Sequence, residues 1–208
     1  EKLKSEQTLP MPNTPYGVSK LVAEEIHKRW QVEKPRERKL IILRPGVVFG
    51  LGEGGNFTRL YQSLKKGVFV YPGRDDTLKA CIYVKDLVNS MSEMAQNFPP
   101  GMHLLNMCYE KPYTIKEIVE TMCKVTGMNP KRRRIPARLL YTISKLLKGV
   151  NTLLGWNILG IHPDRITKLM ISTNISGEKL KQTGCQMRFS LHEAITDWFI
   201  DNNSKELR

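Results

Sequence analysis

The sequence predicts an α/β fold in which the later part of the chain is mostly helical. Two observations support this: short apolar runs alternate with amphipathic helical segments early in the chain, and helical patterns dominate late. No repeat and no low-complexity linker interrupts the pattern. With 208 residues, 40% hydrophobic and 25% charged, the chain is large enough for one globular domain with an additional lobe.

The first helix is predicted by its flanking residues and its periodicity. Thr14 can cap the helix start, and Pro15 suits the first helical position. Four apolar residues then recur on one stripe at helical spacing: Leu21, Val22, Ile26 and Trp30. The apolar run at 40–43 follows as a predicted buried strand, and it is expected to end in a turn at Pro45-Gly46.

The middle of the chain combines a glycine-rich loop with short regular elements. Four glycines within residues 50–55 predict a flexible loop, and 58–67 predicts a short amphipathic helix closed by Gly67. Residues 69–73 are typical of a short strand and turn. The segment 81–97 passes from a strand into a helix, with Asp86 near the helix start as a cap or loop anchor.

The later elements have clear end signals. A strand is predicted at 101–109, and a helix at 113–127 with Thr114 as its cap and Gly127 as its stop. The stretch 136–159 is apolar and basic, and its apolar residues recur at helical spacing. Two further helices are expected at 176–184 and 190–202.

The charge balance suggests an anionic partner. The chain carries 33 basic and 20 acidic residues, a net charge of +13. Nucleic acid, a nucleotide-linked small molecule and an anionic membrane face are all compatible with this excess. The only tight basic run is 131–134, and no nucleic-acid-binding module surrounds it. We therefore expect no nucleic-acid partner.

Targeting signals and cysteine spacing favour a cytoplasmic protein. No apolar run reaches the length of a membrane span, and the sequence does not open on a signal-peptide pattern. The four cysteines lack CxxC spacing and lie among apolar residues: Cys81, Cys108, Cys123 and Cys185. We expect reduced core thiols rather than disulfides, and no metal site.

Tyr16 and Lys20 form the strongest candidate for chemistry. Residues four apart share one face of a helix, so the phenol and the ammonium point the same way. A nearby cation favours the phenolate form and so suits the tyrosine for proton transfer. The alternative is an exposed tyrosine–lysine pair with no catalytic role, because this spacing also arises by chance.

Several segments, in order, resemble the extended short-chain dehydrogenase/reductase family, in its NAD-dependent nucleotide-sugar epimerase/dehydratase branch. They are PYGVSKLVAEE, LRPGVVFG, GNF, CIYVKDLV, LLNMCYEKPYTIKEIVE and ISGEKLKQTG followed by FSLHEAITDW. The resemblance covers nearly the whole chain. It implies the C-terminal part of a Rossmann-like doubly wound parallel sheet at 1–110, with a substrate loop around 50–80. Residues 111–208 would form a smaller, mostly helical substrate-binding lobe, with some segments interleaved.

The resemblance also implies roles for particular residues. Tyr16 would be the acid/base and Lys20 would hold the nicotinamide ribose, so both are expected to contact the cofactor. Backbone groups of Pro45, Val47 and Val48 would meet the nicotinamide amide, although this segment can equally be only a tight turn.

Substrate contacts follow from the same resemblance. Asn56 would contact the diphosphate or sugar of a nucleotide sugar, although it can also cap a helix. Lys79 takes the place where relatives often carry an arginine on the nucleotide phosphates, and lysine offers charge without a bidentate fork. A second basic phosphate contact is expected near Arg165 and Lys168.

One feature departs from the family pattern. Family members begin with a strand, a glycine-rich turn and a helix that hold the dinucleotide pyrophosphate, and this sequence has no such motif ahead of Tyr16. The family's catalytic serine or threonine is also not found there. We therefore expect the C-terminal part of a longer enzyme, inactive by itself. The residue that selects NAD or NADP would lie in that preceding part, so the cofactor remains either of the two.

The expected reaction is that of an epimerase or a 4-keto reductase rather than a dehydratase. The GNF and PGR loops resemble enzymes of bacterial surface-polysaccharide biosynthesis that act on UDP-linked amino sugars. A homodimer is possible. Two other classes stay open: a non-catalytic module that binds a nucleotide sugar or a partner, and a basic peripheral membrane protein that uses 131–160.

Overall fold

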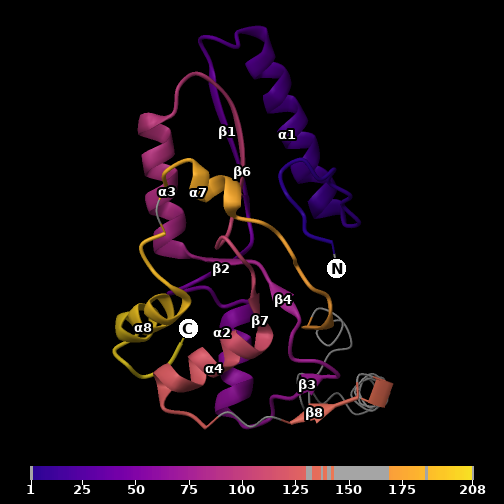
Figure 1. The fold of residues 1–208 in the computed structure, drawn as a ribbon, viewed down its shortest axis with the longest axis vertical. Helices are drawn as coiled ribbons and strands as arrows, with labels where there is room; N and C mark the ends of the chain where they lie inside the picture. The colour runs from indigo at the N-terminus through magenta and orange to yellow at the C-terminus, as the bar shows by residue number, and fades with distance from the viewer. Residues whose placement is uncertain are drawn as a thin grey trace. The chain divides into compact units, whose positions relative to one another are not determined.

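The computed structural model describes residues 2–129, 133–136, 138–139, 142, 169–185 and 187–207 (Figure 1). The chain forms two compact units, each built from three separate stretches. Unit 1 comprises Glu1–Gly50, Ala80–Pro112 and Asn174–Ser190. Unit 2 comprises Leu51–Lys79, Tyr113–Thr173 and Leu191–Arg208. Parallel strand pairs with helices beside them give the α/β class that the alternating pattern predicts.

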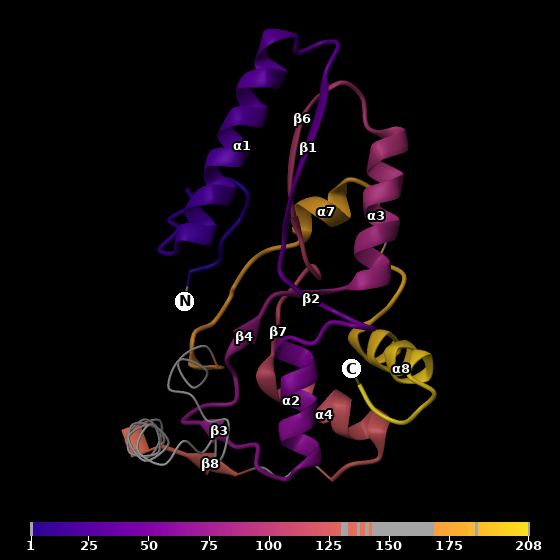
Figure 2. The same ribbon diagram turned by 180° about the vertical axis from the view of Figure 1, so that it is seen from behind.

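Unit 1 is built around two parallel strand pairs. Strand β1 (Lys39–Pro45) pairs with β6 (Gly101–Met107), and β2 (Val47–Phe49) pairs with β5 (Cys81–Tyr83). Helix α1 (Pro15–Glu33) contacts β1 and β6, α3 (Val84–Asn97) contacts β5, and α7 (Glu178–Gln182) contacts β6. Helices α1 and α3 flank the β1–β6 pair (Figures 1 and 2). The buried hydrophobic core of this unit comprises Ile82, Met94, Leu105, Met107, Leu180 and Cys185.

The chain changes strand partner at Gly46, where the sequence predicts a turn. The Gly46 N–H donates to the Met107 carbonyl at 3.0 Å, and the Val47 N–H donates to the Ala80 carbonyl at 2.9 Å. A Cβ at position 46 would lie 2.7 Å from the Ala80 oxygen, so only glycine lets the two backbones approach this closely. The turn prediction is therefore wrong: the backbone continues from β1 into β2, because a second strand is available beside it.

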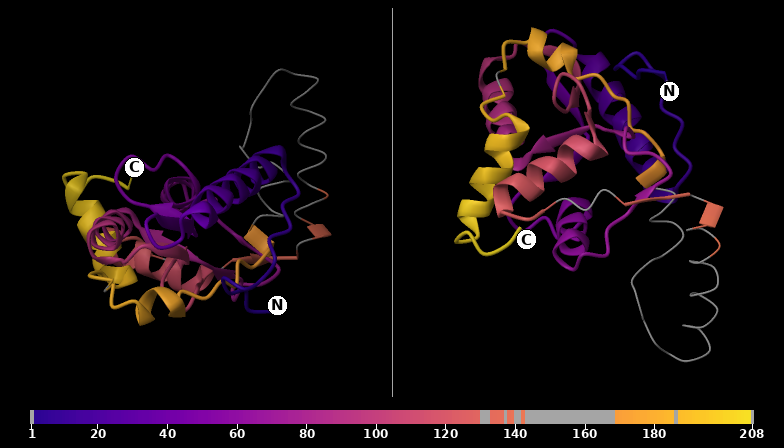
Figure 3. Two further views of the ribbon diagram at one scale, coloured as in Figure 1. Left: turned by 90° about the horizontal axis from the view of Figure 1, so that it is seen from above. Right: turned by 60° about the horizontal axis from the view of Figure 1, so that its bottom comes forward.

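Unit 2 is mainly helical. Helices α2 (Asn56–Lys65), α4 (Ile115–Thr126) and α8 (Leu191–Asp201) supply its core, and α4 contacts both of the others (Figure 3). Short β4 (Leu78–Lys79) runs antiparallel to β7 (Tyr113–Thr114), and β3 (Tyr71–Pro72) runs parallel to β8 (Arg134–Ile135). The side chains exposed by 4% or less include Phe57, Tyr61, Tyr71, Ile118, Met122, Ile195 and Trp198.

The local end signals are confirmed. Thr14 Oγ1 accepts the Gly17 N–H at 3.1 Å at the start of α1. Thr114 and Glu117 form a reciprocal capping box on α4, and Gly127 ends that helix in the left-handed conformation at φ 68°. Helix α2 begins at Asn56, two residues earlier than predicted.

The predictions for the cysteines and for the stretch 136–159 have different outcomes. The four cysteine thiols are buried and form no disulfide, as expected of core thiols. The apolar and basic stretch 136–159 lies almost entirely outside the described residues. Within the part of the chain that the structure describes, no helix is long and apolar enough to cross a bilayer.

Candidate functional site

Tyr16 and Lys20 lie together on the first turns of α1. The Lys20 ammonium is 5.4 Å from the centre of the Tyr16 ring, so the predicted same-face geometry is present. The Tyr16 side chain is 72% exposed, and Lys20 is exposed as well. The phenol and the ammonium are thus both accessible to a ligand, and the capped helix start holds them in one orientation.

The segment from Pro45 to Val48 places different backbone groups in different directions. The Val47 N–H is already bonded to the Ala80 carbonyl at 2.9 Å, within the protein. Hydrogen-bonding directions alternate along a strand, so the Val48 N–H points to the opposite edge of β2. Among the described residues, β2 pairs only with β5. Of the two valines, Val48 is therefore the one whose amide direction suits a nicotinamide amide.

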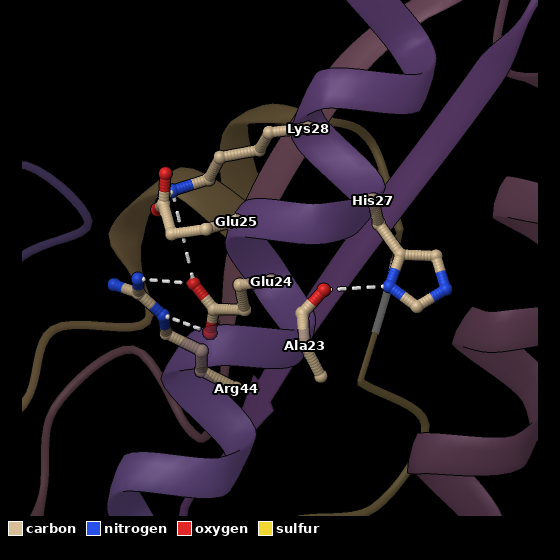
Figure 4. Close-up of polar contacts among 6 residues, drawn as sticks. All are labelled: Ala23, Glu24, Glu25, His27, Lys28 and Arg44. Atoms are coloured by element: carbon tan, nitrogen blue, oxygen red, sulfur yellow. Dashed lines mark hydrogen bonds and ion pairs between the residues drawn. The ribbon is translucent and has the colours of Figure 1, made fainter.

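A bidentate ion pair joins α1 to the end of β1 (Figure 4). Arg44 Nε donates to Glu24 Oε1 at 2.9 Å, and an Arg44 terminal nitrogen donates to Glu24 Oε2 at 2.6 Å. Both side chains are mostly shielded, with 22% and 17% exposure. The hydrogen bonds from Arg44 lower the pKa of Glu24, and the same contact raises the pKa of Arg44. The pair is therefore fully charged at neutral pH.

Sequence reasoning missed this pair. Glu24 stands four residues after Lys20, on the same face of the predicted helix, and Arg44 directly precedes Pro45. This spacing could have indicated that the two side chains lie near the candidate site. The adjacent Glu25 was an equally good candidate from sequence. In the structure Glu25 instead binds Lys28 at 2.7 Å.

Two buried carboxylates in unit 1 serve the backbone. Glu6, 9% exposed, accepts the Asn106 N–H at 2.8 Å, and this contact had no clear sequence signal. Asp86, 1% exposed, accepts the Arg188 N–H at 2.8 Å. Burial raises the pKa of Asp86. Asp86 is thus an anchor, as predicted, but it holds the chain near Arg188 rather than its own helix start.

The glycine-rich loop at 50–55 leads into the start of α2. Glu53 accepts the N–H groups of Phe57 at 3.3 Å and Thr58 at 2.9 Å. Gly55 is the N-cap of α2 and Asn56 is its first residue, so the alternative in which Asn56 caps this helix does not hold, and Glu53 accepts the first amides instead. A carboxylate on these amides repels a phosphate, so this helix start does not suit a dinucleotide pyrophosphate.

The predicted substrate residues Asn56 and Lys79 belong to unit 2. Asn56 is the first residue of α2 and is exposed. Lys79 is half-buried on β4, and its Nζ donates to the Ile171 carbonyl at 2.7 Å. This bond fixes the direction of the Lys79 side chain. Arg165 and Lys168 lie outside the described residues.

The chain shows clear similarity to known proteins. Residues 1–108 match the model of the NAD dependent epimerase/dehydratase family. The N-acetyl-alpha-D-glucosaminyl-diphospho-ditrans,octacis-undecaprenol 4-epimerase of Escherichia coli O157:H7 is 31% identical over 108 residues, which cover 52% of this chain and 33% of that protein.

Two solved structures share the fold. MoeE5 in complex with UDP-glucuronic acid and NAD has a TM-score of 0.66 at 22% identity, covering 97% of this chain and 60% of that chain. The UDP-N-acetylglucosamine 4-epimerase from Bacillus cereus has a TM-score of 0.66 at 16% identity, covering 94% and 57%. The chain therefore spans less than two thirds of the length of each of these relatives.

Proposed function

The chain belongs to the NAD dependent epimerase/dehydratase family, and on this premise we propose that the natural protein is an NAD(P)-dependent nucleotide-sugar epimerase or 4-keto reductase. The observation that carries the proposal is the Lys20 ammonium 5.4 Å from the Tyr16 ring, at the exposed start of α1. A UDP-linked sugar is the proposed substrate, because solved structures of the same fold hold UDP-glucuronic acid or UDP-glucose.

Tyr16 is the proposed acid/base. As a phenolate it takes the proton of a sugar hydroxyl, while the hydrogen on the same carbon leaves with its electron pair and a ketone forms. NAD(P), when bound, supplies the hydride acceptor for this step and the hydride donor for its reverse. Lys20 holds the ribose hydroxyls and stabilises the phenolate by its charge, and the Val48 amide orients the nicotinamide amide.

The chain's own residues suit the nicotinamide end of such a cofactor. Tyr16 and Lys20 are exposed on one helix face, and the Val48 amide points away from the bonded edge of β2. A cytoplasmic location is part of the proposal, because four unpaired cysteines suit a reducing compartment.

Replacing Tyr16 tests the assignment. In the intact natural protein, we expect Tyr16→Phe to lower kcat for UDP-N-acetylglucosamine by about 10³-fold, because only the proton-transfer group is lost. The amount of bound cofactor should not change. Tyr61→Phe, which removes a hydroxyl from a buried tyrosine of α2, serves as the control. Near-normal turnover by Tyr16→Phe would refute the acid/base role. Binding of the sugar nucleotide without turnover by the wild-type protein would favour a non-catalytic module.

Asn56 and Lys79 are proposed to bind the diphosphate of the substrate. Removing one charge-assisted hydrogen bond with Lys79→Ala should weaken binding of the UDP sugar by about 1.5–3 kcal/mol. Titration calorimetry measures this difference directly, and unchanged affinity would remove Lys79 from the substrate contacts.

A polyprenyl-diphosphate-linked N-acetylhexosamine is a second candidate substrate. It is favoured by the relative that is 31% identical over 108 residues, whose name specifies an undecaprenol-linked sugar. Both candidates share a sugar diphosphate and differ in what it is attached to. Parallel turnover assays with UDP-N-acetylglucosamine and the lipid-linked sugar decide between them.

A further inference from the structure

The inward stripe of α1 is largely polar. Six residues of the helix are buried or half-buried, and three of them carry polar or charged side chains: Gly17, Leu21, Ala23, Glu24, Lys28 and Gln31. Gln31 is the single fully buried residue within the described helix. On the other side, the apolar residues Val22, Ile26 and Trp30 are 52%, 63% and 45% exposed. Apolar burial in unit 1 therefore does little to fix the rotation of α1.

The Glu24–Arg44 fork is the directional contact on this stripe (Figure 4). Two parallel hydrogen bonds between planar groups hold both a distance and an orientation, which a single ion pair does not. Lys28 lies 4.0 Å from Glu24 Oε2 but approaches Glu25 more closely, at 2.7 Å. The Glu6 and Glu25 carboxylates also act on the Arg44 charge, although more weakly than Glu24 does.

The fork lies between the two parts of the proposed cofactor contact. Glu24 is one helical turn beyond Lys20 and two beyond Tyr16, while Arg44 directly precedes Pro45 in the segment that ends at Val48. Eight residues of helix separate Glu24 from Tyr16, about 12 Å at a rise of 1.5 Å per residue. A tilt of about 5° at Glu24 would move Tyr16 by about 1 Å, a misplacement that can cost about 100-fold in rate.

We propose that Glu24 and Arg44 are positioning residues that set the rotation and tilt of α1 against the end of β1. They thereby hold Tyr16 and Lys20 in register with the segment from Pro45 to Val48. Neither residue touches the reacting atoms. The inference rests on the proposed function for its catalytic consequence, but the structural link between α1 and β1 is independent of it.

Three variants of the intact natural holoenzyme test the proposal. Glu24→Gln keeps the shape but removes the charge, and Arg44→Lys keeps the charge but removes the fork. Glu25→Gln is the matched control, because Glu25 is adjacent, pairs with Lys28 and does not form a hydrogen bond to Arg44. We expect kcat to fall about 10- to 100-fold in the first two variants and to change less than about twofold in the control.

Two further readouts separate positioning from partial unfolding. With a substrate deuterated at the carbon that gives up hydride, the isotope effect on kcat should increase in Glu24→Gln, because misplacement slows the chemical step itself. A smaller folded fraction would leave the isotope effect unchanged. The double variant should lose no more activity than the worse single variant, since both changes remove one interaction.

Hydrogen exchange tests the link without turnover. Backbone amides of 16–24 should exchange several-fold faster, up to about fivefold, in Glu24→Gln than in Glu25→Gln, while amides of α3 stay unchanged. If the wild-type protein turns over no sugar substrate, the proposed function fails, and the exchange experiment still decides on the fork. Equal exchange in the two variants, or an unchanged kcat in Glu24→Gln, would overturn the positioning role.

Discussion

Helices α1 and α4 begin with the same kind of threonine cap but are held in place by opposite kinds of contact. Helix α4 buries five residues in unit 2: Ile115, Ile118, Val119, Met122 and Cys123. Helix α1 in unit 1 buries Gln31, exposes Val22, Ile26 and Trp30, and is tied to β1 by the Glu24–Arg44 fork. Helix α4 is therefore a stability element, whereas α1 carries the candidate chemistry on a polar attachment.

The difference has a physical consequence. Apolar burial is non-directional and grows with the area removed from water, so it resists unfolding but tolerates small rotations. A bidentate ion pair contributes less stability but constrains direction. A helix that must present Tyr16 and Lys20 in one orientation benefits from the second kind of contact.

The largest expected effect is a difference in stability between substitutions on the buried apolar face of α4 and on the exposed apolar face of α1. Ile118→Ala should lower the free energy of unfolding by about 2–5 kcal/mol, because it opens a cavity in the core of unit 2. Ile26→Ala removes a side chain that is 63% exposed and should cost less than about 0.5 kcal/mol. Urea unfolding of the intact natural protein measures both. A cost for Ile26→Ala as large as that for Ile118→Ala would show that the outer face of α1 is covered, and the comparison would fail.

The threonine caps should give an intermediate effect. Thr114→Ala should destabilise the protein by about 1 kcal/mol, because it breaks a reciprocal capping box with Glu117 on a packed helix. Thr14→Ala removes a single hydrogen bond to Gly17 at an exposed helix start and should cost less. The two variants are compared by thermal unfolding under one condition. A greater loss for Thr14→Ala would mean that α1 contributes more stability than its contacts indicate.

The smallest expected effect depends on pH. The pKa of Glu24 is lowered in the folded state, so the fork stabilises the fold above the unfolded pKa of about 4.3. That contribution is lost as pH falls through the folded pKa. The stability difference between wild type and Glu24→Gln should thus be no more than about 1 kcal/mol at pH 7 and vanish in acid. For Ile118→Ala the difference should not depend on pH, and a pH-independent Glu24→Gln difference would contradict the ionic origin of the fork.

Much of the secondary structure followed from short-range signals. The start of α1 at Pro15 and both ends of α4 were predictable, because a cap depends on a few neighbouring residues. The family, the α/β class and the shared face of Tyr16 and Lys20 were also predictable from ordered motifs and helical spacing.

Other features could not be predicted, because each depends on a contact with a residue distant in the sequence or on which of several nearby side chains makes a given hydrogen bond. Gly46 was expected in a turn, but it is the single residue between β1 and β2, and the backbone runs on there close to Ala80. A helix cap was the alternative role for Asn56, but the loop brings Glu53 to the first amides of α2.

The sequence alone therefore determined where α1 begins, where α4 begins and ends, and which family the chain joins, since these depend on residue type and local spacing. The tertiary structure decided that Glu24 rather than Glu25 meets Arg44, that the Val47 N–H bonds to Ala80, and that each compact unit is assembled from three separate stretches. Local spacing cannot identify the residue that makes such a contact, because neighbouring side chains differ mainly in the direction in which they point. The contact is fixed only when a segment distant in the sequence packs against one of them.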